Sequence, residues 1–272
     1  MNVLAVPKHM PLVVTTRGER VECVHYGSIA VVDEGGKLVA ALGEPQALHF
    51  TRSALKPLQA LPFVEDDGLG RLRLTSHELA LMCASHNGEH VHVDIVRRLL
   101  ARIGAAEDDL QCGSHAPYYF AATGTPARGG RYGPLFHNCS GKHAGFMAYC
   151  RLHGHRLAHY LALESPVQVR IRNVVQQFAH GDDVALGIDG CSCPNYALPL
   201  TRLAHIYQQL AAGTTPELAA LAFAMKRHPD LVSGTGRIDL ALALAGKGDW
   251  LSKVGAEGVQ AIGVTSRGLG IA

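Results

Sequence analysis

Short β-branched segments lie near both ends of this chain, and helical segments fill the region between them. The segments PLVVTT, VECVHYG, IAVVD and KLVAALG fall within residues 11–42 and are separated by glycine-containing turns. Further strand-like sequence covers residues 250–264. This order predicts an α+β (mixed α/β) fold, in which one antiparallel sheet is built from both termini and accompanied by a helical region. We expect residues 1–65 and 230–272 to form the sheet-containing part, and residues 66–229 to be mainly helical.

In the middle of the chain, several segments repeat apolar side chains at helical spacing, some more regularly than others. Residues 89–103 repeat apolar side chains on one helical face, and residues 76–85 begin with a good capping residue at Thr75 or Ser76. Residues 113–135 are rich in Gly, Pro, Ala and Thr, which is typical of a loop. The other expected elements are a helix near 53–65, helical sequence at 143–180 with a capped helix start at Ser165-Pro166, a pair of helices at 199–225, a helix at 237–245, and a short strand at 184–188.

Composition excludes several classes of protein. The 272 residues are 47% hydrophobic, which is enough for a substantial core. Only 18% are charged and the net charge is +2, so a nucleic-acid or membrane-surface partner is not expected. The N-terminus lacks the pattern of an export signal, and no apolar stretch reaches the roughly 18 residues of a membrane span. Seven cysteines in such a chain favour free thiols, metal ligation or redox chemistry over disulfides. We therefore expect a cytoplasmic protein.

The first segment whose side chains could take part in catalysis is Ser53-Ala54-Leu55-Lys56. A serine hydroxyl is a poor nucleophile until a base removes its proton. Residues three apart face the same side of a helix, so Lys56 could reach Ser53. The positive end of a helix would lower the pKa of the lysine and favour its amine form. An ordinary helix start with an exposed lysine has the same pattern.

Two further segments place polar side chains after apolar sequence. Ser85, His86 and Asn87 offer a nucleophile or donor, a base, and an amide that could orient a carboxylate, although a helix C-cap turn looks the same. In the segment HNCSGKH, Cys139 and His143 are four residues apart and could face one cation if that segment is helical. The alternative there is a thiol and a lysine in a loop.

The last two segments adjoin expected strands. Cys191 and Cys193 are closer together than the cysteines of a zinc finger, but one of them could join Cys139 on a zinc ion. A tight turn with two inert thiols, or a Cys-x-Cys redox switch, would also explain them. Lys253 precedes a strand and could enter a site from the sheet, although alone its segment is typical of a turn.

The order of these segments is more informative than any one of them. FTRSALKPLQ, CASHNGEH, HNCSGKHAGF, DGCSCPNYALPL and KVGAEGVQAIG follow one another as in the rhizobial-type (thermolabile, class 3) L-asparaginases, which the chain resembles from about residue 11 to its end. The resemblance implies a fold similar to serine β-lactamases, penicillin-binding proteins and Ser-x-x-Lys glutaminases. It also implies hydrolysis of L-asparagine to L-aspartate and ammonia, by proteins that are usually homodimers.

The resemblance further implies a set of site residues. Two catalytic serine–lysine pairs are expected, namely Ser53 with Lys56 and Ser85 with Lys253. Zinc is expected on Cys139, Lys142 and Cys191. Substrate-contacting or supporting roles fall to Arg52, His86, Asn87, Asp189 and His143. Two neighbouring lysines lower each other's pKa by repulsion, so one can be neutral near pH 7. We favour Ser85 as the nucleophile, with Ser53 and Lys56 relaying protons.

Three features depart from the family pattern. Cys193 stands where a small residue is expected, so it could compete for the metal or form a disulfide. Asp239 stands where the family can offer a cysteine. The chain also ends at Ala272, where the family continues, which suggests a truncated product. Rival interpretations are a Ser-x-x-Lys amidase acting on glutamine or a β-lactam, and a non-catalytic zinc-binding or redox-sensing protein.

Overall fold

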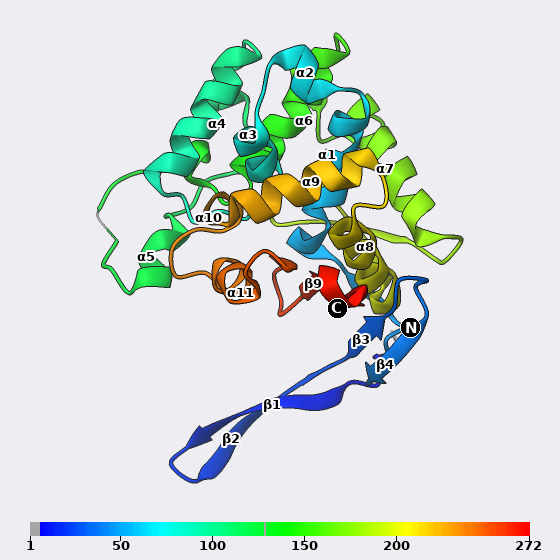
Figure 1. Ribbon diagram of the computed structural model, residues 1–272. Coiled ribbons are helices and arrows are strands. Elements are labelled where there is room, and N and C mark those ends of the chain that lie inside the picture. Colours follow the sequence, from blue (N-terminus) through cyan, green and yellow to red (C-terminus); the bar gives the residue numbers. More distant parts are fainter. Residues whose placement is uncertain (1–5, 128) are drawn as a thin grey trace, which may run out of the picture.

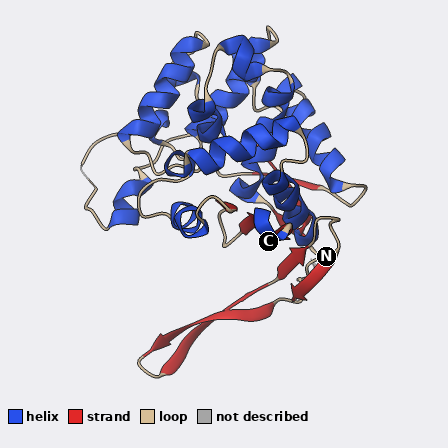
Figure 2. Ribbon diagram, in the orientation of Figure 1, coloured by secondary structure: helices blue, strands red, loops and turns tan. Residues whose placement is uncertain are grey.

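The helices gather on one side of the molecule and most strands lie on the other (Figures 1 and 2). The computed structural model describes residues 6–127 and 129–272. The main sheet has five strands in the order β4 (Leu38–Leu42), β3 (Ile29–Val32), β10 (Leu269–Ile271), β9 (Gln260–Val264) and β8 (Trp250–Val254). Every neighbouring pair is antiparallel. The prediction of an α+β fold with a sheet from both ends of the chain is confirmed; the finer likeness to serine β-lactamases stays a prediction.

Helix α8 (Leu200–Ala212) lies directly against this sheet. A Cβ atom on Gly263 would collide with the carbonyl oxygen of Tyr207, and one on Gly270 with that of Ala204. The two glycines therefore let the helix backbone approach the strands closely. This close packing fixes α8 over β9 and β10, next to the strand that carries Lys253.

A long hairpin projects from the body of the molecule, and the lower part of Figure 1 shows it as an arm. It consists of β1 (Met10–Arg17) and β2 (Arg20–Gly27), which pair antiparallel around the turn at Gly18. Seven large apolar side chains of the arm are exposed, namely Met10, Leu12, Val13, Val14, Val21, Val24 and Tyr26. We call this surface the hairpin arm.

A second sheet of three strands was only partly expected. Its order is β5 (Leu48–Phe50), β7 (Pro194–Pro199) and β6 (Ala185–Ile188), again antiparallel. The sequence pattern indicated β6 but missed β7, which is buried at every position. The turn between β6 and β7 carries Asp189, Cys191 and Cys193, so this small sheet positions three candidate site residues.

The helices pack around a common core, in which α6 is buried along most of its length. Their bounds are α1 (Lys56–Glu65), α2 (Gly68–Leu72), α3 (Ser76–Met82), α4 (His90–Arg102), α5 (Tyr118–Thr123), α6 (Ser140–Leu152), α7 (Pro166–Ala179), α9 (Pro216–Arg227), α10 (Pro229–Val232) and α11 (Ile238–Gly246). Short 3-10 turns are η1 (Arg52–Leu55), η2 (Glu107–Asp109), η3 (Pro134–Phe136), η4 (Leu157–His159) and η5 (Thr265–Arg267).

One expectation about the helices was wrong. The segment 113–135, expected to be a loop, contains α5. The helical sequence over 143–180 forms two helices, because the chain turns at Gly154, and α7 begins at the predicted cap, Ser165. None of the helices in the described ranges is long and apolar enough to cross a membrane. The proposed division of the chain at residues 65 and 229 stays a prediction.

Candidate active site

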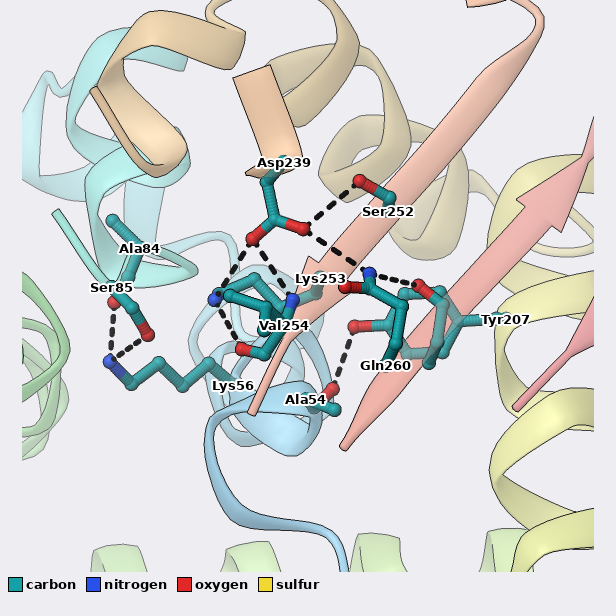
Figure 3. A network of polar contacts seen from close by, with 11 residues as sticks. Ala54, Lys56, Ala84, Ser85, Tyr207, Asp239, Ser252, Lys253, Val254 and Gln260 are labelled. Carbon is teal, nitrogen blue, oxygen red and sulfur yellow. Dashed lines mark hydrogen bonds and ion pairs between the residues drawn. The ribbon is translucent and has the colours of Figure 1, made fainter. Parts of the chain in front are cut away.

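Lys56 and Ser85 meet in the interior, although they come from different elements (Figure 3). Lys56 is the first residue of α1, and Ser85 lies in the loop after α3. The Nζ atom of Lys56 donates hydrogen bonds to Ser85 Oγ at 2.9 Å and to the carbonyl oxygen of Ala84 at 2.5 Å. Both side chains are buried. A hydroxyl and an amine are thus held at proton-transfer distance away from bulk water.

The loop that carries Ser85 is held in place by backbone hydrogen bonds. The N–H of Ser85 donates to the carbonyl oxygen of Val232 at 2.9 Å, and the N–H of Asn87 donates to that of Ser233 at 2.9 Å. These two bonds tie the loop to the segment between α10 and α11. The Asn87 side chain adds a bond from Nδ2 to Thr235 O at 2.9 Å, while its buried Oδ1 has no partner among the described residues.

Lys253 approaches the same region from β8. Its Nζ lies 3.4 Å from Asp239 Oδ2 and donates to the carbonyl oxygen of Val254 at 2.7 Å. Burial lowers the pKa of Lys253, the Asp239 carboxylate opposes this, and the charge of Lys56 lowers it further, with a net value of about 8. Lys253 therefore changes charge close to neutral pH.

The structure pairs the serines and lysines differently from the sequence pattern. Lys56 bonds to Ser85, and the carboxylate of Asp239 rather than Ser85 is the partner of Lys253. The Ser53 hydroxyl makes no hydrogen bond with any described residue. Ser53 lies in η1, which the hydrogen bond from Tyr207 Oη to the carbonyl oxygen of Ala54 anchors at 2.7 Å.

Arg52, directly before Ser53, is strained and charged. Its φ of +49° is rare for a residue with a side chain, and such strain is concentrated at functional sites. Its Nε and one terminal nitrogen each lie 2.9 Å from Asp189 Oδ1. Arg52 lines a surface hollow of about 390 Å³, whose lining also includes Phe50, Ile188 and Asn195. Since Arg52 directly precedes Ser53 in the chain, this hollow opens beside the segment that carries Ser53.

His86 is engaged on both sides of its ring. Burial lowers its pKa well below the usual value, so the ring is neutral. Its Nδ1 accepts from the N–H of Gly88 at 3.1 Å, so Nε2 carries the hydrogen and donates to Ser140 Oγ at 2.8 Å. His86 therefore joins the Ser85 loop to the start of α6, and neither nitrogen is left for a substrate.

The thiol cluster lies at the start of α6 and in the β6–β7 turn. Lys142 Nζ donates to Cys191 Sγ at 3.1 Å. Hydrogen bonds from the Cys139 and Cys193 thiols lower the pKa of Cys191. Burial disfavours the ammonium form of Lys142, but the negative charge of the thiol cluster, which Cys191 carries, outweighs it and raises the pKa of Lys142. The cluster therefore holds a thiolate facing an ammonium ion.

His143 lies against the same cluster. Burial is the main cause that lowers its pKa to about 4, so the ring is neutral. Its Nδ1 is 2.7 Å from Tyr160 Oη, and its buried Nε2 has no partner among the described residues. All seven cysteines, each within the described ranges, are free thiols, so the expected possibility of a Cys193 disulfide is not realised.

The donor set decides whether a metal fits this cluster. No three His, Cys, Asp or Glu side chains of the described residues are grouped to hold a metal ion. The amine of Lys142 supplies a third donor beside the sulfurs of Cys139 and Cys191. Thiolates and a nitrogen are ligands that zinc accepts, so these three residues fit the predicted site once the lysine loses its proton.

Sequence reasoning noted Asp239 only as a departure from a pattern, yet the carboxylate is central to the site. It is buried at the start of α11 and bonds to β8 and β9 (Figure 3). One signal was available. Asp239 is the single charged side chain in the apolar sequence IDLALALAG, where an unpaired charge would be costly.

Comparison with known proteins agrees with this arrangement of motifs. Residues 13–272 match the family described as L-asparaginase II, which is nearly the whole chain. The chain belongs to the L-asparaginase II family. No curated protein matches it. Family membership makes the protein an amidohydrolase of the asparaginase type with a small-molecule substrate, and it confirms the resemblance found in the sequence.

Proposed function

We propose that this L-asparaginase II family member hydrolyses L-asparagine to L-aspartate and ammonia, with Ser85 as the nucleophile and Lys56 as its base. The observation that carries the proposal is the 2.9 Å contact between Lys56 Nζ and Ser85 Oγ in the buried interior. A general base must lie within about 2.6–3.2 Å of the atom whose proton it takes. Lys56 satisfies this requirement for Ser85.

The reaction proceeds in two halves. The uncharged amine of Lys56 takes the Ser85 proton as Oγ attacks the amide carbon, and the developing negative oxygen needs nearby N–H donors. The C–N bond then breaks, the nitrogen takes a proton, and ammonia leaves. Water attacks the resulting ester, its proton passes to the basic group, and aspartate is released with the Ser85 hydroxyl restored. The free hydroxyl of Ser53 is available to relay protons at the edge of the site.

The charges at the hollow suit an amino acid. Arg52 would bind the α-carboxylate, and Asp189 would bind the α-ammonium group, in place of the ion pair they form with each other. The unpartnered Oδ1 of Asn87 can accept a hydrogen bond from the substrate amide. His86 and His143 would support the loop and the cluster rather than contact substrate, since both rings are buried and hydrogen-bonded.

Zinc is proposed on Cys139, Lys142 and Cys191. When bound, it would supply a fixed positive charge that orders the start of α6 and the β6–β7 turn and orients the substrate. Binding requires Lys142 to give up the proton it shares with the Cys191 thiolate. The fully reduced thiols fit the cytoplasmic location that we propose, since such compartments keep cysteines unpaired.

A homodimer is proposed through the hairpin arm. An isolated two-stranded hairpin is marginally stable in water, and this one exposes apolar side chains on both faces. The seven roughly half-exposed apolar side chains present on the order of 600 Å² per chain, so two copies reach the ~1,200 Å² of the smallest stable interfaces. The charges near the tip, from Arg17, Glu19, Arg20 and Glu22, balance, which favours a second copy over a charged partner.

Ser85→Ala and Lys56→Ala test the catalytic proposal. Each is expected to lower ammonia release from asparagine by on the order of 10³-fold or more, with an unchanged circular dichroism spectrum. Ser233→Ala is the matched control, because Ser233 is a buried serine beside the same loop whose hydroxyl has no partner among the described residues. Full activity of S85A would remove Ser85 as the nucleophile.

The substrate is tested on the wild-type protein. Ammonia release from asparagine is compared with that from glutamine, and with hydrolysis of a chromogenic β-lactam, between about pH 6 and 10. Asparagine is expected to be the best substrate. A higher rate on glutamine or on the β-lactam would replace asparagine in the proposal, while bound zinc without ammonia release from either amide would favour a non-catalytic zinc protein.

A further inference from the structure

Asp239 is a carboxylate buried at the junction of α11, β8 and β9 (Figure 3). Only 2% of its surface is exposed. One oxygen accepts from the N–H of Val254 at 2.9 Å and faces Lys253 Nζ at 3.4 Å. The other accepts from Ser252 Oγ at 3.1 Å and Gln260 Nε2 at 3.3 Å. A carboxylate in such a place is costly unless it is fully paired, and here both oxygens are paired.

The two lysines of the site have different surroundings. Lys56 Nζ contacts a hydroxyl and a carbonyl oxygen, which are both neutral. Lys253 Nζ contacts a carboxylate, which stabilises the ammonium form. The other titratable or charged groups that act on or beside Lys253 are Lys56, Arg237 and the thiol of Cys83. Lys56 and Arg237 are basic side chains that carry no negative charge, and burial raises the pKa of Cys83 and keeps its thiol neutral. Within the described residues, Asp239 is therefore the only anion facing this amine.

We propose that Asp239 is a positioning residue that keeps Lys253 as an ammonium ion beside the Ser85–Lys56 pair, so that Lys253 delivers the proton to the departing amide nitrogen. This inference rests on the proposed amide hydrolysis and divides the work between the two lysines. Lys56 receives the proton of Ser85, and Lys253 donates one from the opposite side of the site.

The protons balance over the first half of the reaction. As the C–N bond breaks, its electron pair stays on nitrogen, which takes a proton from Lys253 and leaves as ammonia. Lys253 is then an amine and Lys56 an ammonium ion. Transfer of one proton from Lys56 to Lys253 restores both groups for the attack of water on the ester. No oxidant, reductant or further reactant is needed.

The pH dependence of kcat/KM tests the inference. Activity requires protonated Lys253 and falls on the alkaline side as this proton is lost, near its pKa of about 8. Asp239→Asn removes the charge that holds the proton, so the alkaline limb is expected to move to lower pH by roughly 1–3 units. Asp239→Glu keeps the charge, so its alkaline limb is expected to lie close to that of the wild type. An alkaline limb that stays in place or rises in D239N would overturn the inference.

Asp249→Asn is the matched control. Asp249 is an acidic residue directly before β8, the strand that carries Lys253, and its carboxylate bonds to Ser266 instead of a lysine. Its pH profile is expected to coincide with that of the wild type. A limb that moves equally in D249N and D239N would show a general effect of lost negative charge and would count against Asp239.

Direct titration of Lys253 separates this inference from the proposed function. Protein labelled with ¹³C at lysine Cε is titrated by NMR, and the Lys253 signal is assigned by its absence in Lys253→Arg, which keeps the positive charge. The pKa is expected near 8 in the wild type and lower in D239N. If the wild type releases no ammonia but the pKa of Lys253 is lower in D239N, the proposed function fails while the coupling of Asp239 to Lys253 stands. If the wild type releases ammonia but Lys253 is already neutral below about pH 7, the inference fails. The wild-type titration decides even if D239N does not fold.

Discussion

Two buried tyrosines show how one hydroxyl can position a segment of the candidate site. Tyr207 Oη donates to the carbonyl oxygen of Ala54 at 2.7 Å, so α8 supports the 3-10 turn that carries Ser53. Tyr196 is buried to a similar degree, but its hydroxyl has no partner among the described residues. Two side chains of the same type therefore differ mainly in the bond that their hydroxyls make.

Tyr207→Phe is expected to lower the free energy of unfolding by about 1–2 kcal/mol, because it leaves the carbonyl oxygen of Ala54 buried and without this donor. Tyr196→Phe should cost less than about 0.5 kcal/mol or stabilise the protein, since no bond is lost. Chemical denaturation of both variants measures the difference. Equal losses would mean that the bond at Ala54 contributes nothing of its own.

At this scale the sequence predicted that Ser53, Lys56, Ser85 and Lys253 gather in one pocket. The structure brings Lys56 into contact with Ser85, while the catalytic roles of all four residues stay a prediction. The spacing of Ser53 and Lys56 favoured a bond between them, but the chain turns through η1 at this point and Lys56 reaches across to the loop after α3. The partnership of Lys253 with Asp239 was missed, because it depends on how α11 packs on β8. Tertiary packing decides which of two nearby side chains forms the bond, so the sequence pattern alone does not predict it.

Helix α6 packs on α3 through two glycines with different surroundings. A Cβ atom at Gly141 would collide with the backbone carbonyl of Leu81. At Gly145 the nearest atom is the flexible side chain of Met82, at 2.8 Å. The close approach at Gly141 holds the start of α6, where Lys142 lies, against the end of α3, which leads to Ser85.

Gly141→Ala is expected to destabilise the fold by about 1–3 kcal/mol, because backbone cannot move aside as a side chain can. Gly145→Ala should be near neutral, since the gain in helix propensity of up to ~1 kcal/mol offsets the displacement of Met82. Thermal unfolding of the two variants tests this. A larger loss in G145A than in G141A would contradict the role given to the Leu81 contact.

Helices and strands could be predicted from the sequence where one face is polar and the other is apolar. The pattern at 89–103 gave α4 to within a residue at each end, because its apolar side chains face one way. Strand β7 was missed because all its positions are buried and it lacks alternation, and its Pro194 and Asn195 are typical of turns. The start of α7 was predicted from its cap, because Ser165 accepts from the N–H of Gln168 and Pro166 suits the first helical position.

The hairpin arm is the feature of the whole molecule on which the proposed homodimer rests. Val14 and Val24 are paired across its strands and are exposed by 50% and 40%. The double change Val14→Glu with Val24→Lys keeps an attractive cross-strand pair but removes the apolar contact with a second copy. We expect the wild type to sediment as a dimer and the variant as a monomer.

Analytical ultracentrifugation measures this. Phe223→Lys is the control, because Phe223 is an apolar side chain, 61% exposed, on α9, which lies far along the chain from the arm. A monomeric wild type, or an arm variant that remains a dimer, would refute the proposed interface. Dissociation of F223K but not of the arm variant would move the interface to α9.

Strand β10 joins the two ends of the polypeptide, because it pairs with β3 on one side and β9 on the other. During synthesis, β3 and β4 leave the ribosome long before they can acquire this neighbour, so the five-stranded sheet closes only after residue 271 has emerged. Until then β3 and β4 are not joined to β9 and β8. We expect a nascent chain to present an unpaired β3 edge to chaperones until β10 has emerged.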